Sequence, residues 1–432
     1  MRAWGDRVDE AQIEGALIKA LGSGVVAESD RAVVFHDMCL LRDRLQHLQS
    51  DFPPRTLHAV AIKANPIVAI LHALAEQGAG LEAASLEETA LALAAGCPPE
   101  RIVFDSPAKT VAELHEALRI GFVLNVDNFA ELARIDEILA TSSTASLIGL
   151  RVNPMVGAGS IGITSVADGG SKFGVRIDIE RDAIFEAFAR YDWLRGLHMH
   201  VGSQGCDLDL FVRAASVIED LYTEITRRFG AERVAFVDIG GGLPVEYTAA
   251  DKPPSLTEFL AAMSAAVPSL FDGKVRLITE FGRAVHSGCG FAASRVEYVK
   301  GFADHELAVI HLGADMFMRP VYLPEQWKHR FLVCDCHGRI KRGARKRYTI
   351  GGPLCFAGDL VARDLELPAI EPGDFVVVRD VGAYTVSMWS RHCSRGLPKV
   401  VGFDADRDNA LQVLLRPETP ADVVQFWGGA EL

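Results

Sequence analysis

The stretch His58-Ala-Val-Ala-Ile-Lys63-Ala-Asn-Pro66 places a single lysine after five mostly apolar residues. Apolar runs of this length that contain Val and Ile are typical of buried strands, and the Asn-Pro dipeptide ends the strand. A buried lysine is costly unless its charge is paired or removed, and a desolvated lysine forms Schiff bases with carbonyls. Two interpretations of Lys63 follow: a Schiff-base lysine, or a lysine whose ammonium reaches solvent from the strand end.

The composition indicates a large globular chain of more than one domain. The 432 residues are 49% hydrophobic and carry a formal net charge of -13, which argues against nucleic acid or an acidic membrane surface as partner. No uncharged apolar run approaches the roughly 18 residues of a membrane span. We therefore expect a small-molecule partner, no nucleic acid and no membrane.

Eight cysteines are scattered along the chain, and the first residues contain no apolar segment typical of a secretion signal. These features predict reduced thiols and a cytoplasmic location. The segment Cys334-Asp-Cys336-His337 resembles half of a metal site, but no second cluster completes a tetrahedral ligand set. No metal is expected.

From His58 onward, strand-like and helical patterns alternate eight times. The strand-like runs are 58–63, 81–85, 101–106, 122–127, 146–152, 196–202, 233–240 and 276–281. Eight such units predict an α/β fold, a (β/α)8 TIM barrel, over residues 37–285. An open doubly wound sheet is the alternative, but no Gly-x-Gly-x-x-Gly follows the first strand. After residue 286 short β-rich runs take over, so we assign 1–36 and 286–432 to a second, all-β domain (barrel- or sandwich-like).

Barrel enzymes carry their active sites at the C-terminal ends of the strands. There the sequence places Lys63, Arg151, His198, His200, Gly240–Gly242, Glu280, Gly282 and Arg283. The glycines allow backbone N–H groups to close on an anion. The two histidines face inward, where stacking or structural roles are favoured over metal ligation. A lysine, an anion cradle, an inward imidazole and an inward carboxylate together describe a pyridoxal phosphate (PLP) site.

The chain resembles the fold-type III PLP-dependent decarboxylases, the group of ornithine, diaminopimelate and arginine decarboxylases, and most of all the diaminopimelate branch. The motifs that carry the resemblance span most of the chain: Ala61-Ile-Lys63-Ala-Asn65, Ser171-Lys-Phe-Gly174, His198-Met-His200-Val-Gly-Ser-Gln204, Gly240-Gly-Gly242, Glu280-Phe-Gly-Arg283, Gly352-Pro-Leu-Cys355-Phe-Ala-Gly-Asp359 and Val381-Gly-Ala-Tyr384. The resemblance implies a PLP-dependent amino-acid decarboxylase that releases an amine and CO2.

The resemblance also implies roles for individual residues. Lys63 is expected to form the Schiff base, His200 to stack on the cofactor ring, and Glu280 to pair with the pyridine nitrogen. The phosphate is expected to lie against Ser203, Gly241, Gly242, Gly282, Arg283 and Tyr384. Family members are head-to-tail homodimers with shared sites, in which Cys355 and Asp359 enter the partner subunit's site and Cys355 reprotonates the product carbon. The catalytic set is thus Lys63, His200, Glu280 and Cys355.

Three departures from the family pattern concern the substrate. Phe356 stands where the diaminopimelate enzymes usually have a glutamate that binds the distal ammonium. Arg319 keeps the arginine of the family's Arg-Pro-x-x-Tyr, but Tyr322 is one residue closer than usual. Ser390-Arg-His-Cys-Ser-Arg395 replaces a Tyr-Asn segment and adds positive charge. We expect a substrate with a distal carboxylate or other anion, bound by Arg319, Tyr322, Cys355, Phe356, Asp359 and Tyr384.

Two other functions share much of this pattern. One is a PLP-binding regulatory homologue without activity, which the presence of Cys355 and Asp359 disfavours. The other is an amino-acid racemase, a family that faces the cofactor nitrogen with arginine, where Glu280 stands here. The sequence does not identify the amino acid, the handedness of its reacting carbon, or a carrier-protein requirement.

Overall fold

The computed structural model describes residues 1–429, which divide into two compact units. One unit comprises residues 44–245 and 252–285, and the other comprises 1–43, 246–251 and 286–432. We call them the barrel unit and the β unit. Among residues 1–429, no helix is long and apolar enough to cross a membrane.

The barrel unit is a closed ring of parallel strands, as the sequence predicts. Its hydrogen-bonded order is β2-β3-β4-β5-β6-β8-β9-β10 and back to β2. Each of the eight predicted runs overlaps one strand of this ring. The strands, with β7 paired outside to β6, are β2 (Leu57–Ala61), β3 (Gly80–Ala83), β4 (Ile102–Phe104), β5 (Val123–Val126), β6 (Ile148–Asn153), β7 (Val175–Arg176), β8 (Leu194–His198), β9 (Phe236–Asp238) and β10 (Arg276–Thr279).

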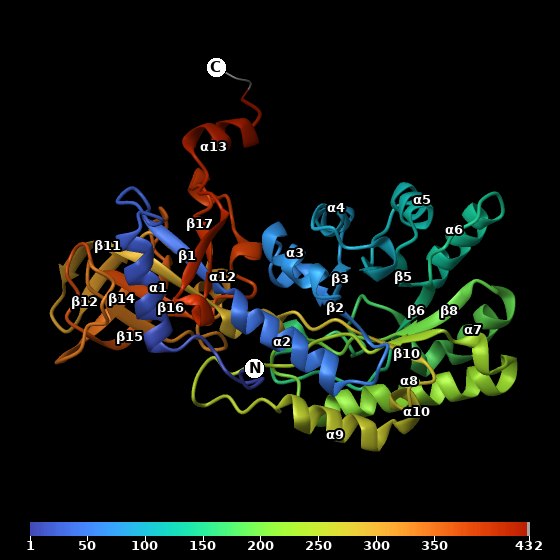
Figure 1. Ribbon diagram of the computed structural model, residues 1–432. Coiled ribbons are helices and arrows are strands. Elements are labelled where there is room, and N and C mark those ends of the chain that lie inside the picture. The colour runs from blue at the N-terminus through green and yellow to red at the C-terminus, as the bar shows by residue number, and fades with distance from the viewer. Residues whose placement is uncertain (430–432) are drawn as a thin grey trace. The chain divides into compact units, whose positions relative to one another are not determined.

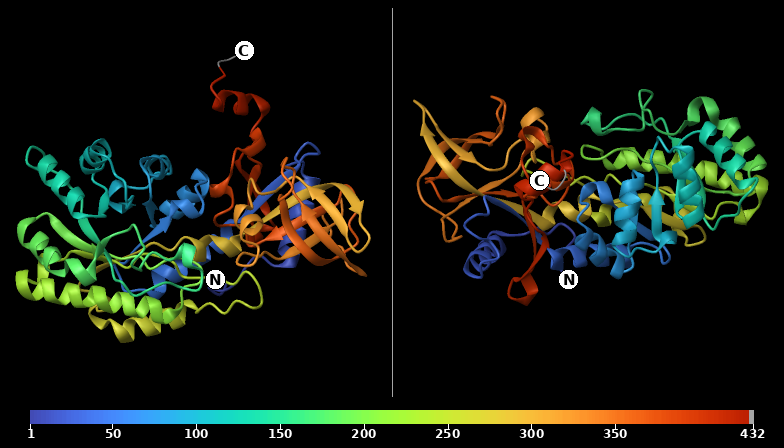
Figure 2. Two further views of the ribbon diagram at one scale, coloured as in Figure 1. Left: turned by 180° about the vertical axis from the view of Figure 1, so that it is seen from behind. Right: turned by 90° about the horizontal axis from the view of Figure 1, so that it is seen from above.

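The helices that connect these strands lie outside the ring (Figure 1, Figure 2). They are α3 (Val68–Glu76), α4 (Leu86–Ala94), α5 (Val111–Ile120), α6 (Phe129–Leu139), α7 (Ile177–Arg190), α8 (Leu208–Phe229), α9 (Leu256–Ala266) and α10 (Pro268–Phe271). Local chemistry fixes their ends. For example, Thr110 and Glu113 form a capping box at the start of α5, and Gly121, with a φ of 97°, ends it. Glycine adopts this left-handed conformation without a Cβ clash.

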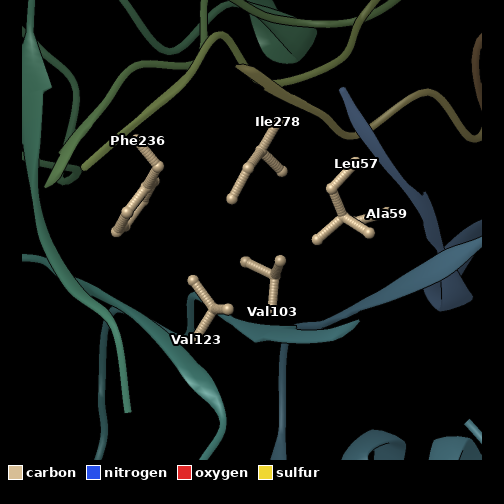
Figure 3. Close-up of a cluster of buried hydrophobic side chains, with 6 residues drawn as sticks. All are labelled: Leu57, Ala59, Val103, Val123, Phe236 and Ile278. Atoms are coloured by element: carbon tan, nitrogen blue, oxygen red, sulfur yellow. The ribbon is translucent and has the colours of Figure 1, made fainter. Parts of the chain in front are cut away.

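Inside the ring, one layer of side chains is apolar. Leu57, Ala59, Val103, Val123, Phe236 and Ile278 are buried together and point toward one another (Figure 3). The ring of Phe236 occupies space left by Gly149 and Gly196, since a Cβ on either glycine would overlap it. The layer closes the lower part of the barrel without a channel, so polar residues above it are shielded from water on that side.

The next inward position on each strand, two residues later, is polar on seven strands. These residues form the polar layer, and all seven are buried: Glu82, Asp105, Asn125, Arg151, His198, Asp238 and Glu280. Side chains of a strand alternate between its two faces, so each polar residue stands directly above the apolar or glycine position of its own strand. The eighth strand, β2, continues through Ala61 to Lys63, which lies in a short 3-10 turn, Ile62–Ala64.

The β unit is built on a mixed sheet, which confirms the predicted second domain. Its order is β15-β14-β12-β11-β1-β17-β18, with β16 joining β11 and β13. The short β-rich runs that the sequence shows after residue 286 overlap strands of this sheet. The strands are β1 (Ala32–Asp37), β11 (Gly290–Gly301), β12 (Glu306–Ile310), β13 (Phe331–Cys334), β14 (Arg345–Gly351), β15 (Leu360–Pro368), β16 (Phe375–Arg379), β17 (Lys399–Asp404) and β18 (Ala410–Leu415).

Helices accompany this sheet. They are α1 (Glu10–Gly22), α12 (Met318–Tyr322) and α13 (Pro420–Phe426), while α2 (Met38–Asp51) and α11 (Arg283–His286) span the boundaries between the units. Phe35 of β1 stacks on Phe291 of β11, with ring centroids 4.6 Å apart, and Phe403 of β17 packs edge-on against both. The N-terminal strand therefore belongs to the core of the β unit, because β1 lies between β11 and β17.

Candidate active site

Lys63 lies just beyond the strand rather than at its last residue. β2 ends at Ala61, and the 3-10 turn then carries Lys63 over the polar layer. Its ammonium contacts both carboxylate oxygens of Glu82, which is fully buried, while the lysine side chain keeps 37% of its surface exposed. The lysine is thus paired and also accessible. The sequence prediction that the first barrel strand ends in Lys63 is corrected by two residues, and the turn lifts the side chain to the mouth of the barrel.

Glu280 is a buried carboxylate of the site. It lies one residue after β10, with its oxygens 3.6 Å from Nε2 of His198 and 3.5 Å from Nδ1 of His200. These distances are long for hydrogen bonds, so the attraction is mainly electrostatic. Burial alone would raise the pKa of Glu280, but the two histidines outweigh it and hold that pKa well below its usual range. Glu280 is therefore held as an anion.

The other carboxylates of the polar layer divide into two classes. Burial, reinforced by the neighbouring Asp105 carboxylate, raises the pKa of Glu82 well above its usual range. Burial and then the Glu280 carboxylate do the same to the pKa of Asp238. Asp105 has a lowered pKa, since Lys63, Glu82 and Arg151 together overcome its burial. Like charges this close do not ionise equally easily, and the raised pKa values mark Glu82 and Asp238 as the carboxyl groups that take up protons most readily.

The imidazole of His200 is held in a fixed orientation. Burial is the main cause that lowers its pKa. Its Nδ1 accepts a hydrogen bond from the backbone N–H of Gly241 at 3.2 Å. The glycine that the sequence assigns to the phosphate therefore also fixes the ring orientation of His200.

The predicted anion cradle is a crowded backbone turn. Gly240 and Gly242 have φ values of 68° and 104°, and a Cβ on Gly241 or Gly242 would overlap the carbonyl of Glu280 or Gly202. A Cβ on Gly282 would likewise lie 2.8 Å from that of Ala64, beside Lys63. Only glycine fits these positions, because each brings backbone into close contact with a neighbouring strand end.

Arg283 completes the cradle in the barrel unit. Its Nε and Nη2 donate to the hydroxyl of Ser203 at 3.3 and 3.1 Å. This contact joins the loop after β8 to the loop after β10, so two of the predicted phosphate ligands are brought together. A guanidinium held this way lies in a fixed plane, and this geometry suits phosphate oxygens.

Sequence reasoning missed four residues of the polar layer: Glu82, Asp105, Asn125 and Asp238. Each is a polar side chain in or directly after an apolar run, which is the same signal that identified Lys63. Asn125 donates to Asp238 at 2.9 Å. The period of two, applied to every strand upward from its apolar residue, would have found them.

Among the described residues, one group has the ligand atoms for a metal ion within 4.8 Å of one another: Asp105, His198 and Glu280. It belongs to the polar layer, beside Lys63 and His200. The segment from Cys334 to His337 forms no such group in residues 1–429, and Cys334 itself is buried in a strand end.

The predicted substrate residues lie in the β unit, and the structure brings several of them together. Phe356 stacks on Tyr322 with ring centroids 6.1 Å apart, and Cys355 beside it is exposed. Arg319 lies over the ring of Tyr384 at 4.7 Å from its centroid, and over Trp327 at the same distance. Cation–π contacts of this kind hold the guanidinium plane in place.

Asp359 serves the backbone in this structure. It is buried, and its two carboxylate oxygens accept hydrogen bonds from the N–H groups of Ala314 and Leu354 at 2.7 and 2.6 Å. Charge-assisted bonds to backbone donors fix a loop strongly. Asp359 thereby ties the loop that carries Cys355 to the segment before α12, and its role as a direct substrate ligand stays a prediction.

The added positive charge near residue 390 is balanced. Arg391 makes a bidentate pair with Glu418 at 2.5 and 2.6 Å, and Arg395 lies 3.4 Å from Asp315. The sequence argument that this segment offers two further cations to a substrate is corrected by these pairs. Arg319 remains as the arginine of the predicted substrate set.

The comparisons with known proteins agree with this geometry. The family model of the pyridoxal-dependent decarboxylases, pyridoxal binding domain, matches residues 39–287. The chain belongs to this family. It is 32% identical to the diaminopimelate decarboxylase of Pseudomonas aeruginosa over 86% of each chain, and 30% identical to that of Methanothermobacter thermautotrophicus over 84% and 83%. A crystal structure of the Helicobacter pylori diaminopimelate decarboxylase with L-lysine superposes with a TM-score of 0.81 at 25% identity, covering 94% and 99%.

The protein is therefore a PLP-dependent amino-acid decarboxylase. The residues present fit the cofactor. An ionised, shielded Glu280 suits a protonated pyridine nitrogen, the glycine turns with Ser203 and Arg283 suit a phosphate, and Lys63 is accessible above them. When bound, PLP supplies the electron sink that lets a carbon–carboxylate bond break.

Replacing Lys63 with Ala tests its assignment. We expect Lys63→Ala to lose both the visible absorbance of lysine-bound PLP and all detectable CO2 release, because no other group in the site forms that bond. Lys274→Ala is the matched control, since Lys274 is an exposed lysine of the same unit. Spectra and CO2 release are measured on both variants after reconstitution with PLP. Persistence of either signal in Lys63→Ala would remove the lysine from the mechanism.

Proposed function

We propose that the enzyme decarboxylates an α-amino acid whose distal end carries a carboxylate or another anion, and not an ammonium group. The observation that carries this proposal is Phe356, which is packed on Tyr322 where the related diaminopimelate enzymes usually place a glutamate. An aromatic pair offers no charge to an ammonium group, whereas Arg319 offers a fixed guanidinium to an anion. The products are an amine and CO2.

The polar layer supports the chemical step. Glu280, held ionised by His198 and His200, would pair with a protonated ring nitrogen of bound PLP. His200 would offer its oriented imidazole face to the ring. Ser203 and Arg283, with the cradle of Gly241, Gly242 and Gly282, would hold the phosphate, and the family resemblance adds the Tyr384 hydroxyl. Lys63 would be the covalent anchor of the cofactor.

Cys355 is the proposed proton donor to the product carbon. Its thiol lies on an exposed loop, and Asp359 fixes that loop through two backbone N–H groups. A proton donor must be placed within hydrogen-bond reach of the atom that it protonates. Asp359 is thus a positioning residue for Cys355, in addition to the substrate contact that the family resemblance implies.

Diaminopimelate is the second candidate substrate. It is the substrate named for relatives that are 30–32% identical over most of both chains. The two candidates make opposite demands on the surface around Phe356, since diaminopimelate presents an ammonium and a carboxylate on the same distal carbon. A non-catalytic homologue and a racemase are disfavoured by the decarboxylases that the chain matches.

We also propose a head-to-tail homodimer, in which Cys355 of the partner subunit enters the barrel site. The family resemblance supports this assembly. All eight cysteines are free thiols, as is usual for proteins of reducing compartments, and this supports a cytoplasmic location.

A matched pair of substrates decides the distal group. We expect CO2 release from 2-aminopimelate, tested in both configurations, to exceed that from meso-diaminopimelate by about tenfold or more in kcat/KM. The two compounds share one carbon skeleton and differ by the distal amino group. Equal or better turnover of diaminopimelate would overturn the argument from Phe356.

Arg319→Gln is the companion variant. It is expected to raise KM for 2-aminopimelate while kcat changes little, because the guanidinium would bind the distal carboxylate equally before and during reaction. Arg363→Gln serves as a control in the same unit, since Arg363 is an exposed residue of β15. Loss of kcat alone in Arg319→Gln would assign that arginine to the chemical step instead.

Mixing two inactive variants tests the shared site. Equal amounts of Lys63→Ala and Cys355→Ala subunits, mixed and allowed to exchange, should recover roughly a quarter of wild-type amine formation, since half the dimers are mixed and each holds one intact site. Each variant alone is the control. An absence of recovery, with subunit exchange verified by differently tagged chains, would place both residues in a site made by one subunit.

A further inference from the structure

Two exposed cysteines of the β unit lie against each other. The backbone N–H of Cys355 is directed at Sγ of Cys393 at 3.5 Å, although 38 residues separate them in sequence. Both residues are exposed and both thiols are free. A backbone N–Cα bond is about 1.46 Å, so Sγ of Cys393 lies within roughly 5 Å of Cα of Cys355. The sulfur of Cys393 thus lies beside the backbone that carries the Cys355 thiol, which is the proximity that a disulfide between the two residues requires.

The loop that carries Cys393 is anchored on both sides. Arg391 is held by its bidentate pair with Glu418, and Arg395 by Asp315 and the carbonyl of His311. Between these anchors the chain has little freedom to carry the thiol away. The two ion pairs that neutralise Arg391 and Arg395 therefore have a geometric consequence, because they hold Cys393 beside Cys355.

The loop that carries Cys355 is fixed as well, and the two loops pack together. Asp359 ties the Cys355 loop to the backbone of Ala314. Phe356 meets the ring of His392 edge-on at a centroid distance of 6.0 Å. One aromatic contact and one N–H to sulfur contact thus join neighbouring positions of the two loops, Cys355-Phe356 and His392-Cys393.

The backbone at Cys393 and Ser394 is strained. Cys393 and Ser394 both have left-handed φ values, 57° and 52°. Such conformations cost about 1 kcal/mol or more for a residue with a Cβ, and consecutive ones are uncommon outside glycine-rich turns. Strain of this kind is often found at functional positions, since the surrounding contacts must hold it.

The remaining cysteines provide a contrast. Five are buried, and burial raises the pKa of Cys97 and Cys206 to about 11 and that of Cys334 to about 12. Such thiols stay protonated and unreactive. Cys336 is the third exposed cysteine. Among residues 1–429 it makes no hydrogen-bond contact with another cysteine of the kind that joins Cys355 and Cys393. It is therefore a natural control.

We propose that Cys355 and Cys393 form an oxidisable dithiol whose disulfide switches the enzyme off. In this step both S–H bonds break and an Sγ–Sγ bond forms. The two protons and two electrons pass to a two-electron thiol oxidant. Hydrogen peroxide is reduced to two molecules of water, and an azo compound such as diamide is reduced to the corresponding hydrazine. A dithiol reductant reverses the step by exchange.

Inhibition by the disulfide rests on the proposed role of Cys355 as proton donor, but formation of the disulfide does not. Once Cys355 is bonded to Cys393 it has no proton to give, and the loop is drawn toward residue 393. Cys393 is a regulatory residue in this account, so its removal leaves turnover of the reduced enzyme unchanged. It also protects the catalytic sulfur, since a disulfide is recoverable and higher oxides are not.

The test compares wild-type holoenzyme with Cys393→Ser and Cys336→Ser, each treated with diamide in the absence of added thiol. Non-reducing peptide mapping reads the bond, and amine formation reads the activity before and after dithiothreitol. In wild type and Cys336→Ser we expect a peptide pair linking Cys355 to Cys393, a fall in activity of roughly 100-fold, as loss of a general acid produces, and full recovery on reduction. Cys393→Ser should keep its activity and give no such pair.

Two results would overturn the proposal. One is the absence of the linked peptides in wild type, and the other is equal inactivation of Cys393→Ser. Complete linkage with unchanged turnover would reject the switch and the proton-donor role of Cys355 together. If the reduced enzyme released no amine from any amino acid, the proposed function would fail, while the peptide map would still show whether the dithiol exists.

Discussion

The rest of the site depends on a negative charge held out of water. Glu280 lies just after β10 above the packed apolar layer, with His198 and His200 at 3.6 and 3.5 Å from its oxygens. A carboxylate in such a place would normally take up a proton. Here the histidines lower its pKa and keep it ionised, whereas the pKa values of the neighbouring Glu82 and Asp238 are raised. This leaves an anion where the family resemblance expects the cofactor's ring nitrogen.

The alternation of inward positions along the barrel strands produces this arrangement. Each polar residue stands two positions beyond an apolar or glycine position of its own strand, so one alternation builds both the floor and the site. The strand that carries Phe236 is an example of this alternation. Its ring fills the space above Gly149 and Gly196, and the next inward residue of the same strand, Asp238, receives Asn125 and faces Glu280. Rigid packing below allows charges above to be placed without water.

The sequence was most informative where hydrophobic periodicity is regular. All eight barrel strands were located from apolar runs, and Lys63, His200 and Glu280 from the polar residues that follow them. Strands such as β14 (Arg345–Gly351) and β15 (Leu360–Pro368) were missed, because exposed and charged side chains interrupt their apolar pattern. The sequence also does not show which residues distant along the chain contact one another. Nothing local to Arg391 or Arg395 shows that Glu418 and Asp315 neutralise them, and nothing local to Cys393 shows that it meets Cys355.

The central claim is that the ionised Glu280 sustains the chemical step, and Glu280→Gln tests it most directly because the amide keeps the shape and removes the charge. The measurement is single-turnover CO2 release by the PLP-loaded variant, with cofactor content read from its absorbance. We predict that the variant retains PLP on Lys63 but loses roughly 100-fold or more of its rate, since the ring nitrogen is no longer held protonated. A fully loaded Glu280→Gln enzyme that releases CO2 at close to the wild-type rate would contradict the account.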